Sequence, residues 1–187
     1  MIIKLLFYAL LLTCPSVLLS DSKIDKYNYS IQFSNLSIAK ISATVKKNEN
    51  KILYSIVSSS DGSLKSFYKF SSTIKGQSKR IRDKLFPSIY ETFSSYKGKT
   101  RKSYVEWVNS NNVLKFQNTP KLDLKKVNKI PQNTIFNVID PFTALINTID
   151  NLQLNNSCVN KFRVFDGRRR YDLEMIELRR SFLKKDR

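Results

Sequence analysis

The sequence predicts a mainly β (α+β) fold, in which a curved antiparallel sheet or a partly open β-barrel packs against one helix. Apolar and polar residues alternate with a period of two over most of residues 26–116, as half-buried strands require. This alternation gives way once to a helical period, after Asp140. A chain of 187 residues is long enough for one domain with its own core. We therefore expect a single β-rich domain over residues 21–187.

The predicted strands follow one another with short polar breaks between them. Such breaks between neighbouring strands favour an antiparallel meander. The segment Leu85-Phe86-Pro87 interrupts the pattern, and residues 119–132 are predicted to form a loop or an edge segment because they are polar and carry two prolines. The predicted strands are residues 27–33, 38–45, 52–56, 64–74, 89–96, 104–108 and 114–116.

The predicted helix begins at Asp140-Pro141, an N-cap residue followed by proline at the first helical position. Apolar residues then recur with helical spacing over about three turns. A helix with such a stripe has to bury it, and the sheet offers the only large apolar surface. The expected buried stripe is Phe142, Leu145, Ile146, Ile149 and Leu152.

Residues 1–20 have the order of a secretory signal peptide. Lys4 supplies a positive charge, Leu5 to Leu12 is an apolar run, and small residues precede the cleavage site that we favour, after Ser20. Two alternatives stay open: a lipoprotein signal with a lipid anchor at Cys14, and an uncleaved N-terminal anchor. All three place the protein outside the cytoplasm, in the periplasm or at the outer membrane.

The chain is strongly basic, with 33 Lys and Arg against 15 Asp and Glu, a net charge of +18. An exported protein seldom meets nucleic acid, so the expected anionic partners are lipid, lipopolysaccharide or another envelope polymer. Peripheral association with a membrane fits the same charge. The alternative is that the lysines form only a solvated surface.

The residue types exclude several chemistries. The sequence has no histidine, which removes Ser-His and Cys-His nucleophile pairs and most zinc sites. After signal cleavage Cys158 is the only cysteine, so no intrachain disulfide can form. We expect no catalytic residue, no cofactor and no metal. A hydrolase without histidine would need carboxylates in one cleft, and the candidates are Asp140, Asp166 and Asp172.

The stretch Val164 to Leu173 is predicted to be a hairpin, because Asp166-Gly167 between alternating residues is typical of a two-residue type I′ turn. Val164 would then lie opposite Arg169, on an apolar face. There Arg169 either pairs internally and reaches water, or contacts an anion or ligand. The other face would be exposed to solvent. The apolar face is Phe162, Val164, Arg169, Tyr171, Leu173 and Met175, and the solvent face is Arg163, Phe165, Arg168, Arg170, Asp172 and Glu174.

Four motifs, in this order, make the chain resemble a known family. It is similar to the domain of unknown function 3108 family, exported and uncharacterised proteins mostly of Gram-negative bacteria. The resemblance implies a β-rich envelope domain with no assigned activity, and no catalytic residue is carried over. It also implies further strands and a second cysteine after the hairpin, so this chain is expected to be truncated at its C-terminus. The motifs are Leu85-Phe86-Pro87-Ser88, Val138-Ile139-Asp140-Pro141-Phe142-Thr143-Ala144-Leu145, Cys158, and Val164-Phe165-Asp166-Gly167-Arg168-Arg169-Arg170-Tyr171-Asp172-Leu173.

Two functional hypotheses follow. The first is a non-catalytic envelope protein that binds a lipid, an acyl chain or a lipoprotein-like partner on its curved sheet, with Arg169 as the contact to an anion. The second is a structural or assembly factor that contacts anionic envelope polymers through its basic surface. In both, the turn and cap residues of the motifs have mainly structural roles; these residues are Asp140, Pro141, Asp166, Gly167, Arg168, Arg170, Tyr171 and Asp172.

Overall fold

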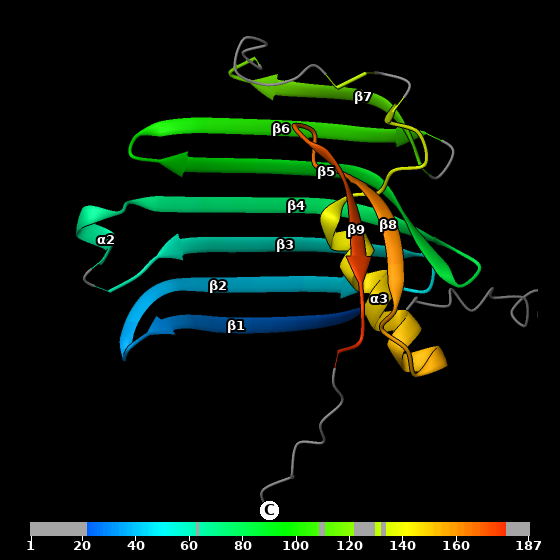
Figure 1. Cartoon of the computed structure of the whole chain (residues 1–187), viewed down its shortest axis with the longest axis horizontal. Helices are drawn as coiled ribbons and strands as arrows, with labels where there is room; N and C mark the ends of the chain where they lie inside the picture. The colour runs from blue at the N-terminus through cyan, green and yellow to red at the C-terminus, as the bar shows by residue number, and fades with distance from the viewer. Residues whose placement is uncertain (1–21, 63, 109–110, 122–129, 132–133, 179–187) are drawn as a thin grey trace, which may run out of the picture.

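The chain folds into an open, seven-stranded antiparallel sheet whose strands follow the chain order, as predicted (Figure 1). The computed structural model describes residues 22–62, 64–108, 111–121, 130–131 and 134–178. The predicted signal segment, with Cys14 and Ser20, lies outside these residues, as does most of the predicted loop after residue 121. The strands are β1 (Lys23–Phe33), β2 (Leu36–Lys47), β3 (Lys51–Ser60), β4 (Phe70–Ile81), β5 (Lys84–Tyr96), β6 (Lys99–Val108) and β7 (Asn112–Thr119).

Two details of the strand prediction were wrong. The predicted fourth strand begins at Phe70, since Leu64–Phe67 forms a short helix, α2, at the end of the sheet. Pro87 does not interrupt the sheet but lies inside β5. The β4–β5 register shifts between Gln77 and Ser78, where Pro87 lies opposite Ser78. A bulge of this kind is where a strand tolerates proline, because the ladder is already irregular there.

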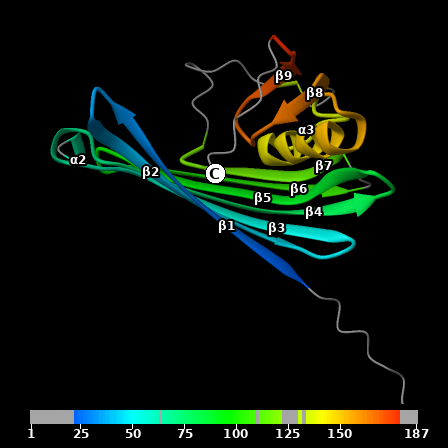
Figure 2. The same cartoon turned by 90° about the horizontal axis from the view of Figure 1, so that it is seen from below.

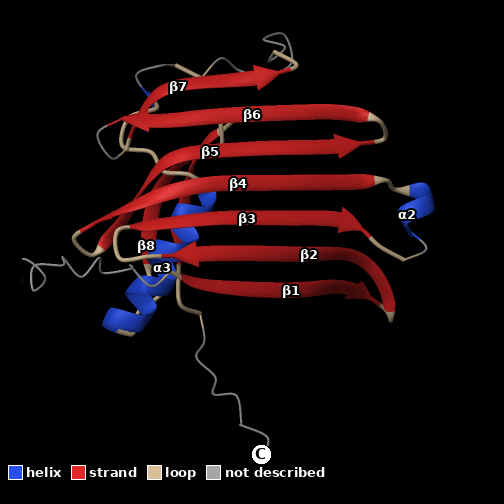
Figure 3. Ribbon diagram, turned by 180° about the vertical axis from the view of Figure 1, so that it is seen from behind, coloured by secondary structure: helices blue, strands red, loops and turns tan. Residues whose placement is uncertain are grey.

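A second layer covers one half of one face of the sheet. It consists of the helix α3 (Pro141–Asn155) and the hairpin of β8 (Asn160–Phe165) and β9 (Arg170–Met175). Figure 2 shows this layer on one side of the sheet only, and Figure 3 shows the other side, over which neither α3 nor the hairpin lies. Hydrogen bonds from Ile139 N–H to the Arg163 carbonyl and from Phe165 N–H to the Ile139 carbonyl, each 2.9 Å, join the segment before α3 to β8.

The main core lies between the sheet and this second layer. Val105, Val138 and Phe165 are completely buried there. The indole N–H of Trp107 donates a 2.9 Å hydrogen bond to the Val138 carbonyl, which ties the segment before α3 to β6. A smaller cluster of Ile139, Ala144 and Val164 fills the space between α3 and the hairpin.

The helix begins where the sequence predicted, but it buries only part of the predicted stripe: Ile146 is buried and Phe142 packs against the core. Asp140 is the N-cap and Pro141 the first helical residue. Three members of the predicted stripe stay 43–44% exposed: Leu145, Ile149 and Leu152. The residues that α3 turns to the sheet and hairpin are smaller and more polar, and they are Thr143, Ala144, Ile146 and Thr148. Short side chains allow close packing. The Thr143 hydroxyl contacts Ser78 on β4, and the Thr148 hydroxyl donates to the Ala144 carbonyl within the helix.

Among the described residues, no helix has the length and apolar character needed to cross a membrane.

Candidate functional site

The hairpin turn is wider than predicted. Phe165 pairs with Arg170 and Val164 with Tyr171, so Asp166–Arg169 forms the loop. The Asp166 carboxylate accepts hydrogen bonds from the backbone N–H of Arg168 (2.8 Å) and of Arg169 (2.6 Å). Gly167 is the one loop residue with a positive φ, +86°, whereas a type I′ turn needs two. The side chain of Asp166 therefore selects the longer loop.

This register removes Arg169 from the predicted apolar face. The observed pairing of β8 with β9 is shifted by two residues from the predicted one, so the paired residues stay grouped on the same two sides of the hairpin. Arg169 instead falls in the loop, and its side chain is exposed. Tyr171 takes its place opposite Val164. Phe165 was expected to face solvent and is instead fully buried, with its ring edge-on to Phe116 at a centroid distance of 5.4 Å.

Gly167 seats the turn directly on the sheet. A Cβ atom at this position would lie 2.9 Å from Val105 Cγ2 and 3.1 Å from Ser103 Cβ, so no larger residue fits without movement. The Gly167 carbonyl accepts a 2.8 Å hydrogen bond from the side chain of Asn118 on β7. The tip of the hairpin is thus fixed to both β6 and β7.

Arg168, rather than Arg169, is the arginine that the turn directs onto the sheet. Its Nε donates to Ser103 Oγ at 3.0 Å, and its Nη2 lies 3.3 Å from the carbonyls of Lys102 and of Thr119. Burial and the positive charge of Arg101 both lower the pKa of Arg168, which the Asp166 carboxylate partly offsets. Arg101 lies two residues before Ser103 on the same face of β6, so Arg101 and Arg168 form a pair of neighbouring like charges.

The remaining motif residues have local contacts. Arg170 is half-buried, and its Nη2 lies 3.0 Å from the carboxylate of Asp172. Asp172 and Tyr171 lie on the exposed part of β9. Among the described residues Cys158 forms no disulfide; it is half-buried, and its Sγ lies 3.9 Å from an oxygen of Glu177. No group of three or more His, Cys, Asp and Glu side chains within the described ranges is arranged to hold a metal ion.

Asp140 anchors a buried polar network between α3 and the sheet. One carboxylate oxygen accepts the N–H groups of Phe142 and Thr143, each at 2.9 Å, and the hydroxyl of Tyr54 at 2.7 Å. The other oxygen accepts the hydroxyl of Thr143, which also contacts Ser78 Oγ at 2.6 Å. Burial raises the pKa of Asp140, although these hydrogen bonds oppose the shift. Burial, reinforced by Asp140, raises the pKa of Tyr54.

The three carboxylates proposed for a hydrolase thus have separate roles. Asp140 is completely buried beneath α3, Asp166 holds the turn, and Asp172 pairs with Arg170.

The half of the α3-side face that lies toward α2 is covered neither by α3 nor by the hairpin (Figure 1). The strand register arranges its residues in three rows that cross β1 to β5, and none of these residues is charged. We call this set the uncovered face. Its rows are Tyr27-Ala43-Ile56-Ile74-Thr92, Tyr29-Ile41-Ser58-Ser72-Ser94 and Ile31-Ala39-Ser60-Phe70-Tyr96.

The uncovered face changes character from one edge to the other. On β1, Tyr27, Tyr29 and Ile31 are 42–55% exposed, which is unusual for large side chains on a face that continues a core. Small Ala and Ser side chains dominate the middle strands. On β6 the three rows continue into Ser103, Arg101 and Lys99. Each row therefore ends at a cation or, at Ser103, at the residue that holds Arg168.

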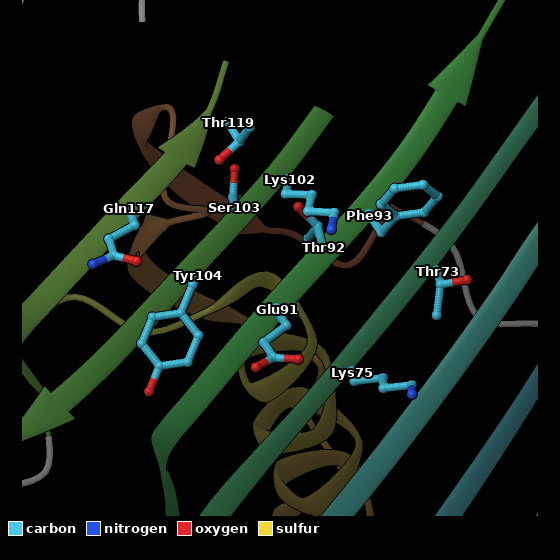
Figure 4. A pocket seen from close by; sticks show the side chains of 10 residues that line it. All are labelled: Thr73, Lys75, Glu91, Thr92, Phe93, Lys102, Ser103, Tyr104, Gln117 and Thr119. Carbon is cyan, nitrogen blue, oxygen red and sulfur yellow. The ribbon is translucent and has the colours of Figure 1, made fainter. Parts of the chain in front are cut away.

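The opposite face of the sheet is charged. An open depression of about 510 Å³ lies on it, and Figure 4 shows Lys75, Glu91, Tyr104 and Gln117 side by side on four strands. The Lys102 ammonium lies 5.6 Å from the centre of the Phe93 ring in the same depression. The strand pairing shows that these six residues project away from α3. Such a mixed polar surface is that of a solvated sheet face.

A second depression, of about 340 Å³, lies between the β4–β5 turn, α3 and β8, and asparagines dominate its lining. The fold itself uses several of their amides. The Asn147 amide bonds both the N–H and the carbonyl of Leu85, at 2.8 and 2.9 Å, and Asn151 donates to the Ser157 carbonyl at 2.8 Å. These amides position α3 against β5 and close the helix C-terminus.

The shape of the structure defines its class: an open antiparallel meander with one helix and one hairpin on half of one face. Residues 28–186 match the model of a family described as "Protein of unknown function (DUF3108)". The chain belongs to this family, as its motifs predicted. No curated protein and no solved structure matches it.

Sequence reasoning missed both Arg168 and the uncovered face. The arginine that enters the interface depends on the loop length, which the Asp166 carboxylate decides. The charge-free rows were present in the sequence, because the predicted strands 27–33 and 52–56 carry no charge and the strands 38–45 and 89–96 carry one each, Lys40 and Glu91. Aligning those faces requires the strand register, which the sequence pattern did not supply.

Proposed function

We propose that this protein is a non-catalytic binding protein of the cell envelope, and that its uncovered face receives the acyl chain of a lipid or of a lipoprotein. The observation that carries the proposal is the uncharged, largely apolar surface that extends the core beyond the edge of α3 and the hairpin. In an antiparallel sheet one face is normally packed and the other solvated. Here half of the packed face has no described partner.

The chemistry of the surface supports an acyl chain over a folded protein partner. The Ala and Ser side chains in the middle of the rows are short, so a thin, flexible chain could lie close to the strands. Tyr27, Tyr29 and Ile31 would then cover it from the β1 side, while Tyr96 and Tyr68, whose rings lie 4.8 Å apart, border the end near α2. Each methylene removed from water contributes about 0.8 kcal/mol.

The location of the protein belongs to the same proposal. A signal peptide over residues 1–20 would deliver the domain to the periplasm or to the outer membrane, where acyl chains of lipids and lipoproteins occur. Fractionation of cells, followed by mass measurement of the mature N-terminus, distinguishes cleavage after Ser20 from lipidation at Cys14. Retention of the full-length chain in the cytoplasm would contradict this part of the proposal.

A blocking substitution with a matched control tests the binding surface. Ser72 lies on the uncovered face between Ser58 and Ser94, whereas its neighbour Ser71 faces the opposite side between Ser59 and Ser95. We expect Ser72→Phe to raise the Kd for a fluorescent long-chain lipid at least tenfold, about 1.4 kcal/mol, and Ser71→Phe to change it less than twofold. Absence of binding by the unsubstituted protein, or equal effects of the two substitutions, would overturn the proposal.

A second candidate function rests on the charged face. Lysines from β1 to β7 project from the side opposite α3, against only two glutamates among the paired residues, Glu91 and Glu106. This asymmetry favours contact with an anionic envelope polymer or membrane surface. Binding to anionic vesicles should then weaken steeply as salt rises from 0.05 to about 0.5 M, since screening shortens the Debye length. Binding that ignores salt would count against it. The lysines are Lys26, Lys40, Lys46, Lys51, Lys75, Lys79, Lys84, Lys102 and Lys115.

A further inference from the structure

We propose that the ligand of the uncovered face is a lipid whose headgroup is a phosphate monoester, and that Arg101 and Arg168 bind this phosphate. This inference rests on the proposed function and adds the chemical class of the headgroup, the place where it binds, and the direction in which the acyl chain runs.

The two arginines meet at one edge of the uncovered face. Arg101 on β6 lies opposite Ser94 and continues the middle row of that face. Ser103, two residues further along β6, continues the next row and accepts the hydrogen bond from Arg168 Nε at 3.0 Å. Both guanidinium groups therefore border the same end of the uncharged rows, one from the sheet and one from the hairpin.

Arg168 is held in place before any ligand arrives. Its Nε and Nη2 are engaged by Ser103, Lys102 and Thr119, and the turn that carries it is seated on the sheet through Gly167. In the part of the chain that the structure describes, no hydrogen bond engages its Nη1. A fixed guanidinium with donors to spare loses little conformational entropy on binding an anion.

The protein offsets the charge of this pair only in part, through the nearby carboxylate of Asp166. Within the described ranges, no ion pair joins Arg101 or Arg168 to a carboxylate, and Asp166 uses its Oδ1 for the backbone of the turn. Two guanidinium groups close enough to affect each other electrostatically, with one half-buried, are unfavourable without a counter-charge. A bound anion would supply that charge.

A phosphate monoester fits this pair better than other lipid headgroups. It carries between about −1.5 and −2 charges at pH 7, which matches two arginines, and its oxygens accept the parallel N–H bonds of a guanidinium. A fatty-acid carboxylate would neutralise only one of the two. A zwitterionic phosphodiester would bring a second cation next to Lys99, which ends the third row.

The acyl chain would then run across the strands. From β6 to β1 there are five inter-strand spacings, roughly 24 Å at about 4.8 Å each. The chain would leave the arginines, pass over the Ser and Ala side chains of β5 to β2, and end against Tyr27, Tyr29 and Ile31. The apolar character of the rows increases in that direction.

The test compares ligands that share one long acyl chain and differ only in the headgroup: a phosphate monoester, a carboxylate, a phosphocholine and a neutral alcohol. The full mature protein should bind the phosphate monoester at least tenfold more tightly than the alcohol, by calorimetry or by displacement of a fluorescent lipid. Its affinity should rise between about pH 5 and 7, as the second phosphate proton leaves, whereas that for the phosphocholine lipid should not.

Single substitutions assign the headgroup site. Arg101→Gln should lower affinity for the phosphate lipid at least tenfold and leave affinity for the alcohol within twofold. Arg168→Lys keeps the charge and loses the planar guanidinium, so it should also lower the affinity for the phosphate lipid, but by a smaller factor. Arg169→Gln is the control, since Arg169 belongs to the same loop and is exposed; it should leave both affinities unchanged.

The outcomes separate this inference from the function on which it rests. If all four lipids bind equally well and Arg101→Gln changes nothing, the phosphate site is refuted and acyl binding stands. The same holds if Arg169→Gln has the effect expected of Arg101→Gln. If inorganic phosphate binds as tightly as the phosphate lipid, the anion site stands and the acyl-binding function fails. If none of the ligands binds, both are overturned.

Discussion

Replacing Asp140 with alanine should weaken the attachment of α3 to the sheet and destabilise the fold. The carboxylate accepts two backbone N–H groups at the start of α3 and the hydroxyls of Tyr54 and Thr143, and it is completely buried. Alanine removes every one of these acceptors at once. Thr143 can still bond Ser78, but the Tyr54 hydroxyl has no other partner in these contacts.

The expected cost follows from two separate losses. Loss of an N-cap acceptor lowers the free energy of unfolding by about 1 kcal/mol. A buried hydroxyl left without its acceptor costs about 1–3 kcal/mol more. We therefore expect Asp140→Ala to lower the free energy of unfolding by about 3 kcal/mol. Asp140→Asn keeps an oxygen for the cap and for Tyr54, so its cost should stay below about 1 kcal/mol.

Urea denaturation followed by the fluorescence of Trp107 measures these values. Trp107 is the single tryptophan of the chain, and its hydrogen bond to the Val138 carbonyl places it two residues from the site of substitution. Tyr54→Phe completes a double-mutant cycle, in which the coupling to Asp140 should be about 1–2 kcal/mol. If the free energy of unfolding of Asp140→Ala lies within about 0.5 kcal/mol of that of the unsubstituted protein, or if the coupling energy is near zero, the account of the network is refuted.

Three further predictions concern neighbouring contacts. Gly167→Ala should lower the free energy of unfolding by about 2–4 kcal/mol, because the new Cβ meets Val105 and Ser103 at a positive φ; a change in urea midpoint smaller than that of Gly98→Ala, a glycine with open space around it, would contradict this. Arg80→Gln and Asp150→Asn should each cost about 1 kcal/mol, because the pair that joins β4 to α3 is half-buried and 2.8 Å long; strictly additive effects in the double variant would show that the pair is not coupled. Burial raises the pKa of Tyr54 and of Tyr90, so the stability that they contribute is complete below their ordinary pKa near 10 and is lost as the pH rises above that value. Tyr54→Phe should therefore make the melting temperature fall less steeply with rising alkaline pH. An unchanged slope would be evidence against this role of Tyr54.

Local sequence patterns predicted most of the strands and the start of the helix. Contacts between segments far apart in the sequence determined which face of the helix is buried. Asp140-Pro141 marked the helix start correctly because capping and the fixed φ of proline act within four residues. The buried face of α3 was predicted only in part: Ile146 and Phe142 contact the core as expected, but Ser78 draws Thr143 inward, and Leu145 and Ile149 stay at the surface.

The candidate site was predictable in part. The motif predicted the hairpin and its turn residues, and it predicted that one of the three arginines would lie off the solvent face. The identity of that arginine was not predicted, because Arg168 is placed by Ser103 and Asn118, far away in the sequence. A turn is set by its own residues, whereas the surface on which it docks belongs to another part of the chain.

The Asp140 network also limits how the molecule can open. Four buried hydroxyl and carboxylate groups now form hydrogen bonds with one another, on Tyr54, Ser78, Asp140 and Thr143. Moving α3 off the sheet would break these bonds and leave the groups in a gap with too little room for bulk water. We therefore expect α3 to stay packed on the sheet and not to open as a lid. A ligand of the proposed binding surface would therefore have to reach the apolar rows from the side of α2 and β1, where neither α3 nor the hairpin covers the sheet.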